Sequence, residues 1–449
     1  MGISYKILLT LLLCLLNQKV FAEDDVLSLL KELKAQVQEL KSQVNKSNER
    51  IAELEKERQQ YRAEHSHTGD KPKQGALTSP VAENTPTQIP DKPAVTVGDV
   101  KGTFKIPGTD TSVGLGGFVK TDVILNSVSA GPDRMGDQQL VLSQIPIGAP
   151  GEHSQLVFHA KESRLWFKSY TPGSWGDINT YLEMDLFGDP ATYTYTPRLR
   201  HAYGSIGNFL TGQTWTTFLN VASLPDSLDV GGSAGAISNL RQPLVRWTQP
   251  FLWAGTPMEV QIALEASRSR LWVDNRLDPS SMINANAGNP NIDAYFTNPN
   301  AERYPDVVSR INFNPDWGNV SIAALGRQIR YSNNTGFQQA AWAGSLSLAG
   351  KINTFGLDNI RFMAHYGNGH GRYLTSPNTF ADAALDRNGN LDLVSAFGGM
   401  LSYQHWWHKQ WRSSVTHGFA EADQPRYVNT VLNRQVQSVH ANLQQFRAS

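Results

Sequence analysis

The chain has 449 residues, with 40 acidic and 40 basic side chains and a mean hydropathy of −0.37. Because neither sign of charge is in excess, the composition excludes the strongly basic surface of a nucleic-acid-binding protein. Beyond residue 22 the chain contains no apolar run of 18 residues, which excludes a protein that crosses a membrane with helices. A single cysteine, Cys14, excludes a disulfide framework and a cysteine-ligated metal.

The first 22 residues have the order of a secretory signal peptide. Lys6 precedes an apolar run over residues 7–16, and Val20-Phe21-Ala22 supplies the end of the signal. We expect the mature chain to begin near Glu23. Because Cys14 lies within the removed segment, the mature protein has no thiol.

Residues 23–64 are predicted to form an α-helical coiled coil. Apolar side chains recur there at alternating intervals of three and four, at Leu30, Leu33, Val37, Leu40, Val44, Ile51 and Leu54. The charged residues between them are solvated flanks. A lone amphipathic helix on a membrane is the alternative, but it needs a basic face that the segment lacks. The β-branched residues at the a positions, with leucine at d, by themselves favour two strands.

Residues 65–100 are predicted to be a flexible linker, because they are rich in Pro, Thr and Ala and have no apolar period. His65 and His67 could bind a metal weakly, but a solvated surface pair is the better interpretation.

From residue 101 to 449 the apolar period changes to two, which predicts an all-β domain. Over residues 178–186, Ile178, Leu182 and Met184 alternate with Glu183 and Asp185, so one face is apolar and the other polar. About fourteen strands are expected, at 112–125, 154–169, 177–187, 197–206, 209–217, 243–249, 257–267, 304–313, 318–330, 338–350, 357–367, 393–406, 411–420 and 436–445.

The lengths of the predicted connections distinguish a transmembrane β-barrel from a soluble β-sandwich. Short connections at 207–208, 314–318 and 408–410 alternate with long ones such as 126–153, 218–242 and 268–303. A transmembrane barrel has short periplasmic turns and longer extracellular loops, whereas a sandwich has no reason to sort its loops in this way. Tryptophans near strand ends are also typical of the aromatic girdles of such barrels.

Three runs make the chain resemble the DcaP-like family of Gram-negative outer-membrane porins: LVFHAKESRLWFKSYTPG (156–173), RHAYGSIGNFLTGQTWTTF (200–218) and SNLRQPLVRWTQPF (238–251). The resemblance extends over nearly the whole chain. It implies a homotrimeric barrel of sixteen strands in the outer membrane, with its coiled coil in the periplasm, that passes small anionic solutes such as dicarboxylates. The implied trimer conflicts with the dimer preference of the coiled coil, and we follow the family.

The C-terminal end departs from the family pattern. Barrels of this kind ordinarily finish on a strand with a terminal aromatic residue, whereas here Phe446 is followed by three more residues and lies on the wrong parity. Either the barrel lacks its last hairpin or it is a natural fourteen-stranded relative. We expect the first, because strand edges left unpaired in lipid are costly.

Arginines are expected on the face opposite the apolar one, because an arginine pointing to lipid at mid-strand costs about 2–4 kcal/mol. Such a set in a narrow lumen attracts carboxylates. Neutralisation by inward acids such as Glu162, Glu183, Asp185 or Glu265 is the alternative. Arg241 and Arg246 are the strongest candidates, because they follow the connection 218–242, which in trimeric porins commonly narrows the pore. The predicted pore-lining residues are Arg164, Arg198, Arg200, Arg241, Arg246, Arg310, Arg327 and Arg361.

Other motifs are weaker. Residues 231–235 match the G-x-S-x-G pattern of nucleophilic serines but lack the surrounding strand, turn and helix. Asp386, Asn388, Asn390 and Asp392 alternate as in calcium loops, without the expected glycine and glutamate, so an ordinary polar loop is the better interpretation. We therefore expect no catalytic residue, no metal and no cofactor.

The sequence thus predicts an outer-membrane porin for passive diffusion of small, preferentially anionic solutes, with a homotrimer and outer-membrane lipid as partners and no nucleic acid. Two alternatives remain. One is a structural tether that links the cell wall to the membrane without transport. The other is a barrel-type hydrolase, for which the strand parities supply no serine, histidine and acid on one face.

Overall fold

The computed structural model describes most of the second of two compact units. Of the first unit, Met1–Pro90, it describes Lys56 alone, so the expected signal peptide and coiled coil lie outside the described residues. In the second unit, Asp91–Ser449, the described residues are 96–127, 154–188, 194–228, 232–233, 235–237, 240–274, 277, 301–333, 336–374, 380–428 and 433–446. No helix within these ranges is long and apolar enough to cross a membrane.

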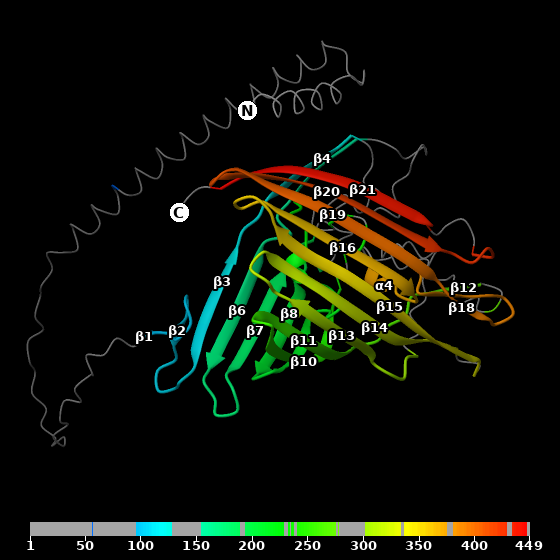
Figure 1. Cartoon of the computed structure of the whole chain (residues 1–449), viewed down its shortest axis with the longest axis horizontal. Helices are drawn as coiled ribbons and strands as arrows, with labels where there is room; N and C mark the ends of the chain where they lie inside the picture. The colour runs from blue at the N-terminus through cyan, green and yellow to red at the C-terminus, as the bar shows by residue number, and fades with distance from the viewer. Residues whose placement is uncertain are drawn as a thin grey trace, which may run out of the picture. The chain divides into compact units, whose positions relative to one another are not determined.

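One antiparallel sheet of sixteen strands dominates the second unit (Figure 1). Strands that are neighbours in this sheet follow one another along the chain, except where short strands of two smaller sheets intervene. Its strands are β1 (Thr96–Val97), β2 (Phe104–Lys105), β3 (Ser112–Phe118), β6 (Arg164–Thr171), β7 (Ile178–Asp185), β8 (Arg198–Ile206), β9 (Phe209–Trp215), β10 (Arg241–Trp253), β11 (Thr256–Glu265), β13 (Asp306–Phe313), β14 (Gly318–Ser332), β15 (Gln338–Asn353), β16 (Asn359–Asn368), β19 (Ser395–His408), β20 (Trp411–Asp423) and β21 (Gln435–Gln445).

The all-β prediction is confirmed for the described residues. Two of the sixteen strands, β1 and β2, have only two residues each. Each of the fourteen longer strands overlaps one of the fourteen ranges expected from the sequence. The first two of those ranges also contain β4 (Asp122–Asn126) and β5 (Gln155–His159), which pair with each other. The strand β1 lies within residues that the sequence assigned to the linker.

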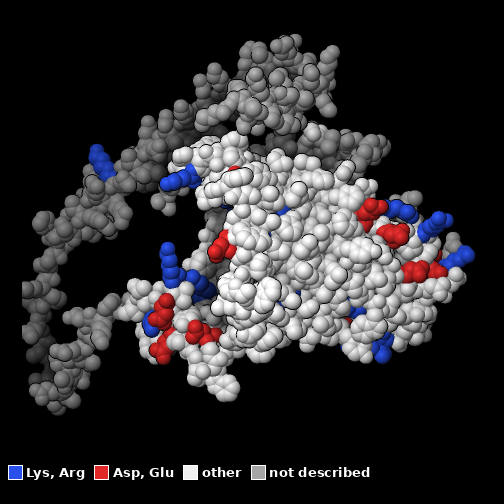
Figure 2. All heavy atoms as spheres, viewed as in Figure 1, with Lys and Arg blue, Asp and Glu red and all other residues white. Residues whose placement is uncertain are grey.

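Side chains alternate between the two faces of the sheet. On β15, Trp342, Leu346 and Leu348 are exposed, whereas the intervening Ser345 and Ser347 are buried. Figure 2 shows one face of the molecule, on which Lys, Arg, Asp and Glu gather toward the two ends and leave a broad middle band almost without charge. An uncharged band of exposed apolar side chains is typical of a surface that contacts lipid.

The connections alternate between short and long, with one exception. Turns of two to six residues follow β6, β8, β10, β13, β15 and β19, whereas β7, β9, β11, β16 and β20 are followed by connections of 11 to 40 residues. The exception is the five-residue connection 333–337 after β14. Because β3 begins beside the end of β6, and β21 ends beside the start of β20, the first and last of the longer strands begin and end on the side of the short turns.

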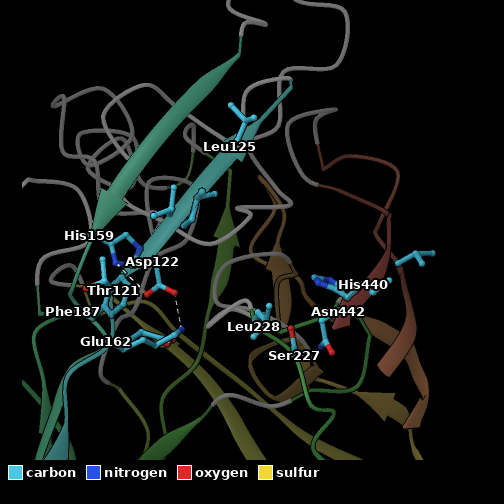
Figure 3. Close-up of a pocket in the computed structure, with 15 residues that line it drawn as sticks. Thr121, Asp122, Leu125, His159, Glu162, Phe187, Ser227, Leu228, His440 and Asn442 are labelled. Atoms are coloured by element: carbon cyan, nitrogen blue, oxygen red, sulfur yellow. Dashed lines mark hydrogen bonds and ion pairs between the residues drawn. The ribbon is translucent and has the colours of Figure 1, made fainter. Parts of the chain in front are cut away.

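The predicted closed barrel is open in this structure. Among the described residues β3 pairs with β2 and β6, β21 pairs with β20 alone, and no ladder joins the two ends of the sheet. Instead, β4 and β21 line opposite sides of a cavity of about 750 Å³ (Figure 3). The sequence-based idea of a missing final hairpin stays a prediction.

A small three-stranded sheet, which we call the plug, packs against the inner side of the large sheet. It consists of β12 (Leu271–Val273), β17 (Ala383–Leu385) and β18 (Leu391–Leu393), and the short helix α4 (Gly371–Leu374) lies between β12 and β17 in the chain. The buried side chains of Leu374, Phe380 and Val394 pack with Ala396 of β19 and Ala420 of β20. The plug therefore occupies the side of the interior bounded by the later strands.

A buried ion cluster ties the plug to β13 and β14. The fully buried guanidinium of Arg327 lies 3.3 Å from a carboxylate oxygen of Asp306 and 3.3 Å from one of Asp382, and it donates to the carbonyl of Gly369 at 3.1 Å. The hydroxyl of Tyr373 donates to the other Asp306 oxygen at 2.6 Å. Each charge is thus paired, as buried charges must be.

Leu346→Arg is expected to impair folding into a bilayer. Leu346 is 60% exposed in the middle of β15, and an arginine at the bilayer midplane costs about 2–4 kcal/mol. The measurement is the folded fraction in lipid vesicles, by the shift in gel mobility on heating, with Leu346→Met as the control. Equal folding of the two variants would contradict the assignment of this face to lipid.

Arg327→Met is expected to destabilise the protein by about 3–5 kcal/mol, because Asp306 and Asp382 would be left as buried, unpaired charges. The measurement is the denaturant midpoint in detergent. Arg330→Met on the same strand is the matched control, because Arg330 is only half-buried and is expected to cost less than about 1 kcal/mol. Equal midpoints for the two variants would show that the cluster does not hold the plug.

Candidate functional site

The polar inner face of β6 to β10 carries the largest group of predicted pore-lining residues. We call it the arginine wall and define it by Arg164 of β6, Arg198 and Arg200 of β8, and Arg241 and Arg246 of β10. The other three predicted arginines, Arg310, Arg327 and Arg361, lie on β13, β14 and β16. The structure thus places five of the eight on alternate strands of one stretch of the sheet, from β6 to β10.

Three members of the wall share two carboxylates of β7. Arg198 binds Asp185 through both arms, with N–O distances of 2.9 and 2.6 Å. Arg200 donates to Glu183 at 2.6 Å and to Asp185 at 2.8 Å, and Arg164 lies 3.6 Å from Glu183. The alternative of neutralisation by inward acids therefore applies to these three arginines.

A register shift between β7 and β8 places two consecutive residues of β8 inside. The ladder pairs Glu183 with His201 but Met184 with Leu199, so Arg200 is an extra residue, and Arg200 and His201 are both buried. His201 is in reach of the Thr214 hydroxyl at 3.0 Å. Strict alternation would have placed His201 outside, which is why the sequence did not suggest it.

Arg241 has no ion-pair partner among the described residues. Its guanidinium carbon lies 4.4 Å from the centre of the Trp215 ring, and its strongest electrostatic neighbours are Arg200, Arg198 and Asp185. Trp215 packs against a buried cluster inside the sheet, so the pair faces the interior. Around Glu183 and Asp185 the structure thus gathers four guanidinium groups, those of Arg164, Arg198, Arg200 and Arg241, against two carboxylates.

Arg246 lies closer to the short turns, with Glu265 and Glu259 as its electrostatic neighbours. Neither forms an ion pair with it. Glu265 accepts hydrogen bonds from the Thr216 hydroxyl at 2.6 Å and the Thr217 amide at 2.7 Å, and the Nε of Arg246 has no hydrogen-bond partner among the described residues. Arg246 is therefore a largely buried guanidinium without an ion pair among the described residues.

The long connection between β9 and β10, residues 216–240, folds across the inside of the sheet, and we call it the inner loop. Arg310 donates to the carbonyls of Thr217, at 3.1 Å, and Leu219. Arg361 donates to the carbonyl of Leu224 at 2.5 Å. These two arginines support the loop rather than stand free, whereas Arg327 is buried in the ion cluster beneath the plug.

Further along, Asn220 donates to Asn319 at 2.6 Å and to Ser321 at 2.8 Å, both of β14, and caps the short helix η3 (Val221–Ser223). Asp226 reaches Arg412 of β20 at 2.7 Å. The described part of the inner loop therefore contacts β13, β14, β16 and β20 from inside the sheet. That the connection 218–242 narrows a pore stays a prediction.

The G-x-S-x-G match has a structural explanation. Gly235 has a φ of 102°, and a Cβ there would lie 2.1 Å from the carbonyl oxygen of Gly399 on β19. The glycine thus lets the inner loop approach the backbone of the sheet. Ser233 is buried, with no hydrogen-bond partner for its hydroxyl among the described residues, so no base is positioned to activate it.

The polar connection after β17 uses its own groups for hydrogen bonds. Asp386 accepts from the backbone of Asn390 at 2.8 Å, its side chain at 2.9 Å and the backbone of Asn388 at 2.8 Å, which lowers the pKa of Asp386. No group of three or more His, Cys, Asp or Glu side chains that could hold a metal occurs in the part of the chain that the structure describes. Beside the plug, burial lowers the pKa of His370 to about 4, so this imidazole is neutral at neutral pH.

A cavity of about 420 Å³ continues the arginine wall toward the short turns. Its lining includes Tyr170, Tyr181 and Tyr203 from β6, β7 and β8, together with Lys168 and Asn179. The rings of Tyr181 and Tyr203 lie 5.7 Å apart. This cavity and the charged group around Glu183 and Asp185 thus lie along the same three strands, β6 to β8.

Comparisons with known proteins agree with this architecture. Residues 91–448 match the family model described as the porin subfamily. A crystal structure of the outer membrane channel DcaP of Acinetobacter baumannii has 18% identity and a TM-score of 0.60, covering 76% of this chain and 88% of that one. No curated protein sequence matches the chain.

Two further solved structures are more distant. An anion-selective porin from Comamonas acidovorans has 12% identity and a TM-score of 0.34, covering 75% of this chain and 98% of that one. The trimer form of OmpT of Vibrio cholerae has 10% identity and a TM-score of 0.33, covering 74% and 96%. At these scores the two likenesses say nothing more about this chain.

The family match extends over most of the chain, and the likeness to DcaP shows a shared fold, so the resemblance found in the sequence is confirmed. Family and fold point to a channel rather than an enzyme. The chain belongs to the porin subfamily and is an outer-membrane porin.

Proposed function

We propose that this porin prefers small anions, dicarboxylates among them. The observation that carries the proposal is the group of four guanidiniums, those of Arg164, Arg198, Arg200 and Arg241, around the two carboxylates of β7. Among these six groups the positive charges exceed the negative ones by two, and the neighbouring Glu162 is paired with Lys120. In this proposal the passage for solutes lies between the group and the inner loop. Dicarboxylates as substrates come from the resemblance stated above.

The magnitude of the attraction suits a channel. A carboxylate about 4 Å from a guanidinium gains about 1 kcal/mol in bulk water and about 4 kcal/mol at an effective dielectric constant near 20. A solute that binds much more tightly would block conduction, so several moderate contacts serve better than one deep site. Arg241 and Arg246 lie at separate positions on one strand, so they offer two moderate contacts instead of one deep site.

Arg241 and Arg246 are the proposed filter, because they are the two members of the wall without an ion pair among the described residues. Arg164, Arg198 and Arg200 add to the positive electrostatic potential around Arg241. Arg310 and Arg361 contribute by positioning the inner loop, and we leave the buried Arg327 out of the pore lining.

We also propose that the N-terminal coiled coil lies in the periplasm and holds three copies together. The first of the longer strands begins, and the last ends, on the side of the short turns, which face the periplasm in barrels of this class. This position of the first and last longer strands supports the proposal.

Arg241→Glu combined with Arg246→Glu is expected to reverse or abolish the anion preference. The exchange replaces the two unpaired positive charges of the passage with negative ones. The measurement is the reversal potential of purified protein in a planar bilayer across a KCl gradient.

Arg387→Glu with Arg426→Glu is the matched control, because it makes the same change in charge at exposed positions of two long connections. Unchanged selectivity in the Arg241 and Arg246 double variant, or a cation-preferring unaltered protein, would contradict the filter. A folded protein that forms no channels would favour the structural tether instead.

Deleting residues 23–64 is expected to leave the barrel inserted but to loosen the oligomer, because the coiled coil is joined to the barrel through a segment whose composition predicts flexibility. The measurements are membrane insertion and oligomer mass in detergent. Loss of insertion, with synthesis and export intact, would count against this separation of roles.

A further inference from the structure

Asp226 of the inner loop is the centre of a hydrogen-bond cluster on the last strands. Its carboxylate lies 2.7 and 3.0 Å from two nitrogens of Arg412 on β20 and accepts from the Gln404 amide of β19 at 2.8 Å. Its backbone carbonyl accepts from the Ser414 hydroxyl at 2.8 Å and from the Asn442 amide of β21. Three neighbouring strands thus bind one residue of the loop.

Arg412 is itself held in place. Its guanidinium carbon lies 5.2 Å from the Trp406 ring and 4.5 Å from the Phe446 ring, and one nitrogen donates to Gln444 at 2.9 Å. A guanidinium fixed in this way loses little freedom when it donates a hydrogen bond to a carboxylate and forms an ion pair with it. The pair is therefore a strong, directional contact.

The contact differs in kind from the other anchors of the loop. Arg310 and Arg361 bind backbone carbonyls, and Asn220 binds neutral side chains. Within the described residues of the inner loop, Asp226 forms the one ion pair with the sheet. Ser227 and Leu228, which follow, line the cavity between β4 and β21 (Figure 3), so Asp226 fixes the loop where the sheet is open.

We propose that the ion pair of Asp226 with Arg412 is a latch that holds the far end of the inner loop against β20 and thereby sets the width of the passage beside the arginine wall. Asp226 and Arg412 act as positioning residues and touch no solute. The inference rests on the proposed channel function and adds to it the residues that determine pore size. Without the ion pair, the far end of the loop loses its charged contact with β20 and relies on neutral hydrogen bonds, such as those that Ser414 and Asn442 donate to the Asp226 carbonyl, so it departs more often from its position against the last strands.

The test uses Asp226→Asn, Arg412→Gln and the double variant in single-channel recording on the full chain. Losing one hydrogen bond to a charged group is expected to raise the time spent in states of altered conductance by about ten- to a hundredfold. The size limit for neutral polymers that enter the pore is expected to change with it. Because the two residues act through one contact, the double variant should match the single ones rather than add their effects.

Asp99→Asn is the matched control. It also removes a carboxylate from an ion pair, with Lys105 at 3.1 Å, but at the start of the sheet and away from the inner loop. Arg412→Lys keeps the charge and loses the guanidinium hydrogen bond to Asp226, so it should fall between the unaltered protein and Arg412→Gln.

Conductance and polymer limits unchanged in Asp226→Asn would overturn the latch, as would additive effects in the double variant or equal effects in Asp99→Asn. These outcomes differ from a failure of the proposed function, in which the unaltered protein itself forms no channels or prefers cations.

Discussion

A strand that crosses a lipid bilayer must pair its backbone N–H and C=O groups with neighbouring strands, because lipid offers no hydrogen-bonding partner. The continuous antiparallel ladders from β3 to β21 meet this requirement over most of the sheet. Since successive side chains point to opposite faces, one apolar face commits every intervening residue to the interior. This constraint collects the arginines, carboxylates and amides of many strands on one inner face.

The arginines of the interior have two roles, and the groups that contact each arginine determine its role. Arg310 and Arg361 bind carbonyls of the inner loop, and Arg327 neutralises two aspartates beneath the plug. The plug and the inner loop fill the side of the later strands. Arg241 and Arg246 remain without an ion pair among the described residues, on the side of the earlier strands, where we propose that solutes pass.

Much of the sheet could be predicted from the sequence, because alternation and loop length are local signals. The ranges expected at 318–330 and 338–350 lie within β14 and β15, and the inner loop lies where loop length suggested a constriction. The partners of the inward arginines could not be predicted. Strand parity gives the face of the sheet on which a side chain lies, but not which side chains or loop carbonyls contact it there. The bulge that turns both Arg200 and His201 inward breaks the parity rule itself. Asp226 carried no signal, since its partner Arg412 lies 186 positions away.

The central claim is that unpaired positive charge in the passage selects anions, and the salt dependence of selectivity in the unaltered protein tests it most directly. Reversal potentials across a fixed tenfold KCl gradient would be measured at low and at high mean salt. The screening length falls from about 10 Å at 0.1 M to about 3 Å at 1 M, so the field of the wall reaches a passing ion only at low salt. The account predicts chloride preference that weakens as salt rises. Cation preference, or a selectivity independent of salt, would contradict it.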